Sequence, residues 1–230
     1  YLPAIFIYND LSLDFTKDNP EKFKDLIWPI ETPLKKKAIS TTMGMSVLYS
    51  PFFAIAHLYA KNSEYLADGY SVPYRFALVF SSLFYVLIGL FFLKKTLSIF
   101  YEDRISALVI LAIGLGTNLL YYYSYEAAMP HAYNFSLISI FMYLTIKFHE
   151  KPTILKIFLI GLLAGFITLI RPTNIIVLLV FFLWNVSSIE TLKQRTYWFL
   201  EQYKFTIIMA IAFVLIWIPQ FMYWLSLIHI

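Results

Sequence analysis

The 230-residue chain contains no cysteine, so it has no disulfide bond and no thiolate for catalysis or metal binding. Charged residues make up only 14% of the chain, whereas soluble domains carry about 25%. The sequence also lacks a Gly-rich phosphate loop, a Ser-His-Asp order, a Cys/His metal spacing, internal repeats and low-complexity tracts. These absences exclude an ordinary soluble domain with one of the common nucleotide, triad or zinc sites.

Apolar residues dominate what is present: 60% of the chain is hydrophobic, 20% is aromatic, and the mean hydropathy is +0.69. This composition predicts an all-α polytopic membrane protein with about five to six transmembrane helices and an interfacial helical N-terminal region. Lys and Arg in cytoplasmic loops account for the net charge of +4, so it does not require nucleic acid as a partner. The spans are expected at Phe76–Leu93, Ile105–Tyr123, Ala132–Ile146, Ile154–Ile170 with a continuation Ile175–Trp184, and Phe205–Trp224.

The composition changes twice along the chain. Residues 1–75 carry too much charge for hydrocarbon and are expected to form an extracytoplasmic loop region with interfacial helices, because the apolar segment Met45–Ala60 is too short for a straight span. Residues 76–224 are expected to form a transmembrane helix bundle. Residues 225–230 resemble the translation of a sequencing adapter, so they are expected to be an artificial tail, and the natural protein is expected to extend beyond both ends of this chain.

The fourth apolar segment is interrupted at Arg171-Pro172. It could form two short helices or one kinked helix, and the proline favours the break. A reversal there puts the loop 124–131, which has no Lys or Arg, and the Arg171 turn on one face with one cation between them, against nine in the loops of the other face. The positive-inside rule then assigns Arg171 and residues 124–131 to the extracytoplasmic face of what is expected to be a bacterial cytoplasmic membrane. The nine cytoplasmic cations are Lys94, Lys95, Arg104, Lys147, Lys151, Lys156, Lys193, Arg195 and Lys204.

Arg171 is the first candidate for a functional residue. A guanidinium at a membrane boundary is costly unless it faces a cavity or an anion, so Arg171 with Asn174 is a candidate site for binding a substrate phosphate. The alternative is an arginine that merely anchors a helix end at the lipid headgroups.

Other polar residues are expected on the same side of the membrane. Glu126 could act as a general base, a metal ligand or an acceptor for sugar hydroxyls, or it could be a solvated loop acid. His131 could donate to a phosphate or bind a metal, or simply begin a helix. Asp68 and Tyr70 are candidates for substrate binding, although turn chemistry also explains Asp68-Gly69. Such a set suits a polyprenyl-phosphate sugar, whose lipid lies in the bilayer while its phosphate and sugar sit at the interface.

Five short motifs, taken in their order and membrane placement, resemble the GT-C superfamily of integral-membrane glycosyltransferases, in particular bacterial relatives of the dolichyl-phosphate-mannose protein mannosyltransferases. They are Tyr1-Leu2-Pro3-Ala4, Thr42-Met43-Gly44-Met45 with Tyr49-Ser50-Pro51-Phe52-Phe53, Ala67-Asp68-Gly69-Tyr70-Ser71, Met129-Pro130-His131-Ala132-Tyr133, and Gly161-Leu162-Leu163-Ala164-Gly165 with Arg171-Pro172-Thr173-Asn174.

The resemblance implies transfer of a sugar from a polyprenyl-phosphate donor to a glycan, lipid or protein acceptor, among membrane lipids. It implies a catalytic acid at a position before Tyr1, so that this chain alone is expected to be inactive. Glu126 looks like the second acidic position of such enzymes, and Arg171 is similar to the basic residue that meets the lipid phosphate. The resemblance makes no cofactor certain, and it leaves a divalent metal open because metal dependence differs within the superfamily. The alternative function is a transporter or flippase of glycolipid-type substrates, and a third is a structural or sensory subunit.

Overall fold

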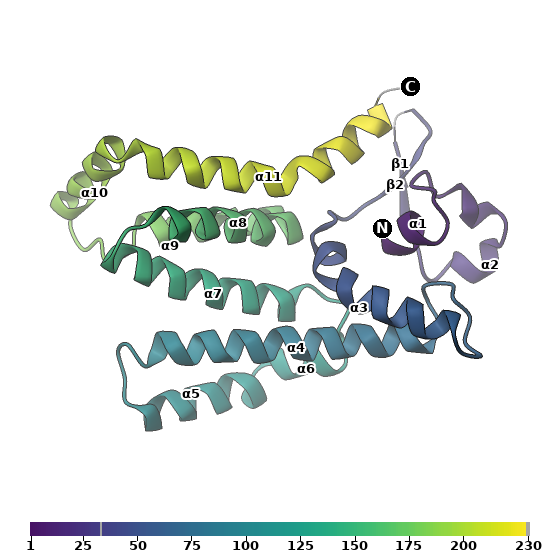
Figure 1. Cartoon of the computed structure of the whole chain (residues 1–230), viewed down its shortest axis with the longest axis horizontal. Coiled ribbons are helices and arrows are strands. Elements are labelled where there is room, and N and C mark those ends of the chain that lie inside the picture. The colour runs from purple at the N-terminus through teal and green to yellow at the C-terminus, as the bar shows by residue number, and fades with distance from the viewer. Residues whose placement is uncertain (33, 229–230) are drawn as a thin grey trace. The chain divides into compact units, whose positions relative to one another are not determined.

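The computed structural model describes residues 1–32 and 34–228, and in these residues it is mainly helical (Figure 1). The chain divides into two compact units. Unit 1 comprises Tyr1–Ser81 and the described residues of Pro219–Ile230, and unit 2 comprises Ser82–Ile218. Two long helices contribute residues to both units, and each unit is described by itself.

Unit 1 is built mostly from short elements. They are α1 (Leu2–Phe6), the 3-10 helix η1 (Asp14–Lys17), α2 (Pro20–Phe23), β1 (Pro29–Glu31), β2 (Lys37–Ile39), α3 (Gly44–Lys61) and the first part of α4 (Val72–Leu97). Unit 2 consists of helices and the turns and loops that connect them. It contains the rest of α4, α5 (Asp103–Gly116), α6 (Asn118–Ser124), α7 (His131–Glu150), α8 (Ile154–Ile170), η2 (Pro172–Ile176), α9 (Val177–Phe182), α10 (Ile189–Glu201) and most of α11 (Tyr203–Ile228).

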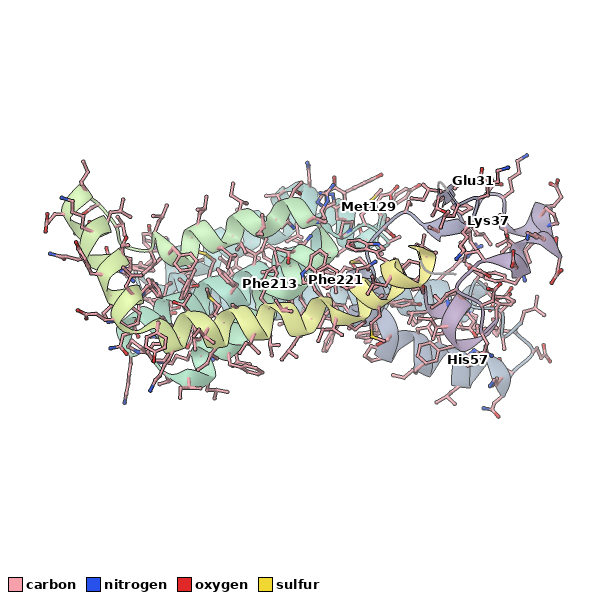
Figure 2. The ribbon with its side chains drawn as sticks, turned by 90° about the horizontal axis from the view of Figure 1, so that it is seen from above. Glu31, Lys37, His57, Met129, Phe213 and Phe221 are labelled. Carbon is pink, nitrogen blue, oxygen red and sulfur yellow. The ribbon has the colours of Figure 1, made fainter. Side chains whose placement is uncertain are left out.

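The core of unit 1 lies where α1, α3 and the start of α4 meet. Its fully buried side chains include Leu2, Phe53 and Tyr74. The antiparallel strands β1 and β2 form a hairpin in which Glu31 is paired with Lys37 (Figure 2). The apolar stretch Met45–Ala60 lies within the single helix α3, whereas the hairpin is not predicted by the sequence pattern.

Unit 2 is organised around α7, which packs along α8 (Figure 1). Large side chains of α7, such as Phe141 and Phe148, are completely buried. On α8, the small residues Gly161 and Gly165 face α11, because a Cβ atom on Gly165 would lie 2.9 Å from the Phe213 carbonyl oxygen. The small residues therefore allow α8 and α11 to approach closely.

Fewer helices meet the requirements for a membrane span than the sequence pattern predicts. Within the described residues, α4 and α11 are long and apolar enough to cross a membrane, and α5 with α6 makes a third candidate if this pair, bent by 58°, counts as one span. The expected number of five to six is not confirmed. α8 has only 17 residues and α9 only six, while α7 is long enough but less apolar than α4 or α11.

The expected span Ile105–Tyr123 is broken between α5 and α6. Thr117 has an extended backbone, and its side-chain oxygen accepts a hydrogen bond from the Leu119 amide at 3.2 Å. Thr117 thus caps a new helix instead of continuing the old one. At the other end of the chain, α11 continues through Leu225–Ile228 of the expected tail, and His229 and Ile230 lie outside the described residues.

Candidate functional site

The turn at Arg171 forms because α8 cannot continue into Pro172. Arg171 has an extended backbone, with φ −144° and ψ 112°, as expected for a residue that precedes proline. Pro172 then starts η2, and the Asn174 amide donates to the Arg171 carbonyl oxygen at 2.9 Å. The Arg171 side chain is exposed and Asn174 is half-buried.

The chain reverses direction at this turn, as the break at Pro172 predicts. η2 and α9 run back beside α8, so that the Phe181 carbonyl of α9 lies 2.9 Å from Nε2 of His149, near the far end of α7. Because α7 and α8 are also antiparallel, the N-terminus of α7 and the Arg171 turn belong to the same end of unit 2. The cationic segments 147–156 and 193–195 belong to the other end.

His131 and Arg171 both lie at the end of unit 2 that carries the turn, near enough for the charge of Arg171 to act on the imidazole. Burial lowers the pKa of His131, and the positive charge of Arg171 lowers it further. The imidazole also stacks on Tyr122, with 3.9 Å between ring centroids. Among the residues that the structure describes, no carboxylate forms an ion pair with Arg171. The same end of unit 2 therefore holds an exposed guanidinium without a counter-ion among the described residues and an imidazole whose pKa is lowered, so that its neutral form is favoured.

Glu126 lies in the segment between α6 and α7. The Tyr121 hydroxyl donates to Glu126 Oε1 over 3.5 Å, a long hydrogen bond, and the side chain is half-buried. Within the described part of the chain, no hydrogen bond or ion pair joins Glu126 to His131 or Arg171. Glu126 thus lies in the segment that leads into α7, five positions before His131, but its side chain is hydrogen-bonded to a tyrosine.

Asp68 and Tyr70 belong to unit 1, where both carboxylate oxygens of Asp68 have partners. One carboxylate oxygen accepts from the backbone amides of Tyr70 and Ser71 at 2.9 and 3.0 Å, and the other lies 2.8 Å from Lys22 Nζ. Burial alone would raise the pKa of Asp68, but Lys22 and the two amides lower it below its usual value. Gly69 follows with a φ of +86°, which confirms the predicted turn and favours glycine.

Tyr70 is mostly buried against aromatic neighbours of unit 1. Its ring packs edge-on against Phe23 with 5.9 Å between centroids, and burial raises the pKa of its hydroxyl. Asp68 and Tyr70 therefore have a structural role that accounts for their positions, and their contribution to substrate binding stays a prediction.

The sequence does not decide whether the site binds a divalent metal. Across residues 1–32 and 34–228, no three His, Asp or Glu side chains come close enough to hold a metal ion together. We therefore assign no metal ligands, and Glu126 and His131 are considered only for hydrogen bonding and proton transfer.

Tyr122 is a site residue that the sequence pattern did not single out. It is one of four neighbouring tyrosines that also suit an aromatic membrane belt, and nothing in their spacing distinguishes the one that stacks on His131.

Comparisons of the chain with models of protein families, with curated proteins and with solved structures give no match. The case for a function therefore depends on the geometry of the residues themselves.

Proposed function

We propose that this chain is part of a membrane glycosyltransferase that takes a sugar from a polyprenyl-phosphate donor and transfers it to a glycan, lipid or protein acceptor. The observation that carries the proposal is the exposed Arg171, without an ion pair among the described residues, at the same end of unit 2 as His131, whose imidazole feels its charge. Both lie at a helix end where a long apolar segment meets a polar turn.

A phosphate diester at a membrane boundary fits this pair. A guanidinium presents N–H groups in a fork that matches two phosphate oxygens, and the bond is strengthened by charge on both sides. His131 would add a hydrogen bond without adding positive charge. The ring of Tyr122, already stacked on His131, offers a flat surface for a sugar or for the first prenyl units.

In the proposed reaction, the acceptor hydroxyl oxygen attacks the anomeric carbon of the donor sugar. The bond from that carbon to the phosphate oxygen breaks, and polyprenyl phosphate leaves with the electron pair, held by Arg171. The hydroxyl proton passes to a carboxylate, which the resemblance to GT-C enzymes assigns to an acid at a position before Tyr1. Glu126 would orient the acceptor or the sugar through its free carboxylate oxygen.

The proposal includes a membrane topology with five to six spans, in which α7, α8 and η2–α9 cross together with the three candidate spans. The absence of Lys and Arg from residues 124–131 and the cationic segments at the other end of unit 2 support an extracytoplasmic site. A bacterial cytoplasmic membrane is the proposed location.

The test is binding of a radiolabelled polyprenyl-phosphate sugar to the full-length protein in detergent, followed by turnover with a hydroxyl acceptor. Loss of one charge-assisted contact is worth about 1.5–3 kcal/mol, so Arg171→Ala is expected to weaken donor binding by about tenfold or more. Arg104→Ala, which removes an exposed arginine at the start of α5, is the control and is expected to bind normally. Unchanged donor binding and turnover in Arg171→Ala would contradict the phosphate role.

A transporter or flippase is the second candidate, and one observation favours it. α7 buries a series of neutral polar side chains, and the side-chain oxygens of Asn134, Ser136 and Thr145 have no hydrogen-bond partner in the described part of the chain. Such groups could line a polar path along the helix, although they also serve as contacts between membrane helices. Movement of a fluorescent polyprenyl-phosphate sugar across proteoliposomes without hydrolysis or transfer would select this function.

A further inference from the structure

A polar pocket of about 500 Å³ lies at the cationic end of unit 2, away from the Arg171 turn. Five of the residues that line it present polar side chains: His149, Asn185, Thr191, Gln194 and Arg195. The proposed sugar transfer uses none of these residues.

Arg195 is the charged centre of this pocket. Its guanidinium donates to the Trp184 carbonyl oxygen at 3.0 Å and to Nδ1 of His149. Since Nε2 of His149 lies 2.9 Å from the Phe181 carbonyl oxygen, that nitrogen carries the proton and Nδ1 is the acceptor. His149 is then neutral, and among the described residues no carboxylate forms an ion pair with Arg195. A half-buried cation with further N–H groups is left without a counter-ion.

The same arginine also borders an apolar groove of about 450 Å³ between α9, α10 and the start of α11. Phe182, Phe199 and Leu200 are among its lining residues, and three hydroxyl-bearing residues, Thr196, Tyr203 and Thr206, also line the groove. Of these three, the Thr206 side-chain oxygen is buried and has no hydrogen-bond partner among the residues that the structure describes. From the polar pocket into the groove, a ligand would therefore meet the guanidinium of Arg195, then the hydroxyl of Thr206 and the apolar lining of the groove.

The helix that connects the two hollows has the character of an interfacial helix. α10 exposes apolar side chains, with Ile189 76% and Leu200 66% accessible, while Lys193 extends the positive charge along the same helix. Ser188 and Thr191 form a capping box that starts α10 immediately after the loop from α9. These features, an apolar side, cations beside it and a capped N-terminus, are typical of a helix that lies in the plane of a membrane surface.

We propose that these two hollows together bind an anionic glycerophospholipid. Its phosphate binds to Arg195 in the polar pocket. An ester oxygen accepts a hydrogen bond from the Thr206 hydroxyl, and an acyl chain lies along the groove past Phe199 and Leu200. Free phosphate would use only the first hollow, whereas a phospholipid uses the cation, the hydroxyl and the apolar groove. The site does not depend on the proposed glycosyl transfer, since it lies at the opposite end of α7 from His131.

Native mass spectrometry of the whole chain in a neutral detergent tests the proposal, with phosphatidylglycerol and phosphatidylcholine of equal chain length as probes. One phosphatidylglycerol is expected to remain bound at concentrations where phosphatidylcholine does not. Arg195→Gln is expected to weaken this binding by about tenfold, while Arg104→Gln leaves it unchanged. Equal retention of both lipids, or equal effects of both arginine substitutions, would overturn the proposal. So would displacement of phosphatidylglycerol by millimolar inorganic phosphate, which would indicate a site for a free anion.

A second pair of variants covers the case in which Arg195→Gln fails to fold, because Arg195 also holds α10 to α7. Leu200→Glu places a carboxylate in the groove and keeps the contacts of Arg195, whereas Tyr197→Glu adds the same charge at an equally exposed position of α10 that lines neither hollow. Loss of phosphatidylglycerol in Leu200→Glu alone supports the site. Binding that is equal in the two variants contradicts it.

Discussion

His149 is a half-buried imidazole with a pKa of about 4, because burial disfavours its charged form, and Arg195 disfavours it further. The Phe181 carbonyl opposes the shift without cancelling it. The unfolded chain has a histidine pKa near 6.5, so the folded state binds the proton less well. Stability from the neutral His149 is therefore complete above about pH 6.5 and falls between pH 6.5 and about 4.

We expect this loss to amount to about 1–2 kcal/mol after allowance for partial solvent exposure. Thermal unfolding of the chain in a neutral detergent, followed from pH 7 to 4.5, measures it. His149→Phe cannot take up a proton at this position, so the decrease with falling pH should be smaller in this variant. If both proteins lose stability in parallel, His149 is not the titrating group.

Asp68 is a carboxylate whose pKa is also lowered in the folded chain. For a carboxylate, a lowered pKa means that folding favours the charged form, whereas for His149 it favours the neutral form. The contribution of Asp68 is present above its ordinary pKa of 3.8 and is lost as the pH falls through the lowered folded value. Asp68→Asn keeps an oxygen for the amides of Tyr70 and Ser71 but loses the charge that faces Lys22. We expect a loss of about 1 kcal/mol at pH 7, which shrinks in strongly acidic solution.

Asp14→Asn is the matched control for Asp68→Asn. Asp14 also pairs with a lysine, Lys17, but both side chains are more than half exposed. Its replacement should leave the unfolding temperature unchanged at pH 7, because exposed pairs contribute little. Equal effects of the two substitutions would show that the burial of Asp68 does not matter.

At the scale of elements, the contact of α8 with α11 depends on the absence of side chains at Gly161 and Gly165. A Cβ atom at position 165 would lie 2.9 Å from the Phe213 carbonyl oxygen and 3.0 Å from Ile216 Cβ, so one of the two helices must move. We expect Gly165→Ala to destabilise unit 2 by about 1–3 kcal/mol, measured by the shift of the unfolding transition.

Gly116→Ala provides the comparison, because an added Cβ there meets no atom within 4 Å at the end of α5. Alanine is the better helix former, so this change should be neutral or slightly stabilising. A Gly165→Ala protein as stable as Gly116→Ala would mean that α8 and α11 can separate at little cost.

Helix boundaries were predictable where the sequence carries a clear stop. Ile154–Ile170 has the predicted limits because Thr153 caps its start and Pro172 follows its end. The break at Thr117 was missed because the run Ile105–Tyr123 is apolar throughout and a capping threonine is a weak signal. The hairpin β1–β2 was missed because its first strand is exposed at all three positions and shows no alternation.

At the scale of the whole molecule, the positive-inside rule predicts that His131 and Arg171 share one membrane face, and the two residues lie at the same end of unit 2. Contacts between distant residues were not predictable in the same way. Arg195 and His149 are 46 positions apart, and no periodicity indicates that they meet. Asp68 was assigned to the same face as Arg171, but its own partners are local to unit 1 and are explained by the turn at Gly69.

The orientation of the bundle is a prediction that the absence of cysteine makes easy to test, since every introduced thiol is unique. Ser124→Cys lies next to the segment without cations, and Ser187→Cys lies at the end of unit 2 that carries Lys193 and Arg195; both serines are exposed. A cationic segment resists export, so the second position should face the cytoplasm. A membrane-impermeant maleimide added to intact cells should label Ser124→Cys and should reach Ser187→Cys only after permeabilisation. The reverse pattern would place Arg171 in the cytoplasm and Arg195 outside, and labelling of both thiols in intact cells would mean that the intervening helices do not cross the membrane an odd number of times.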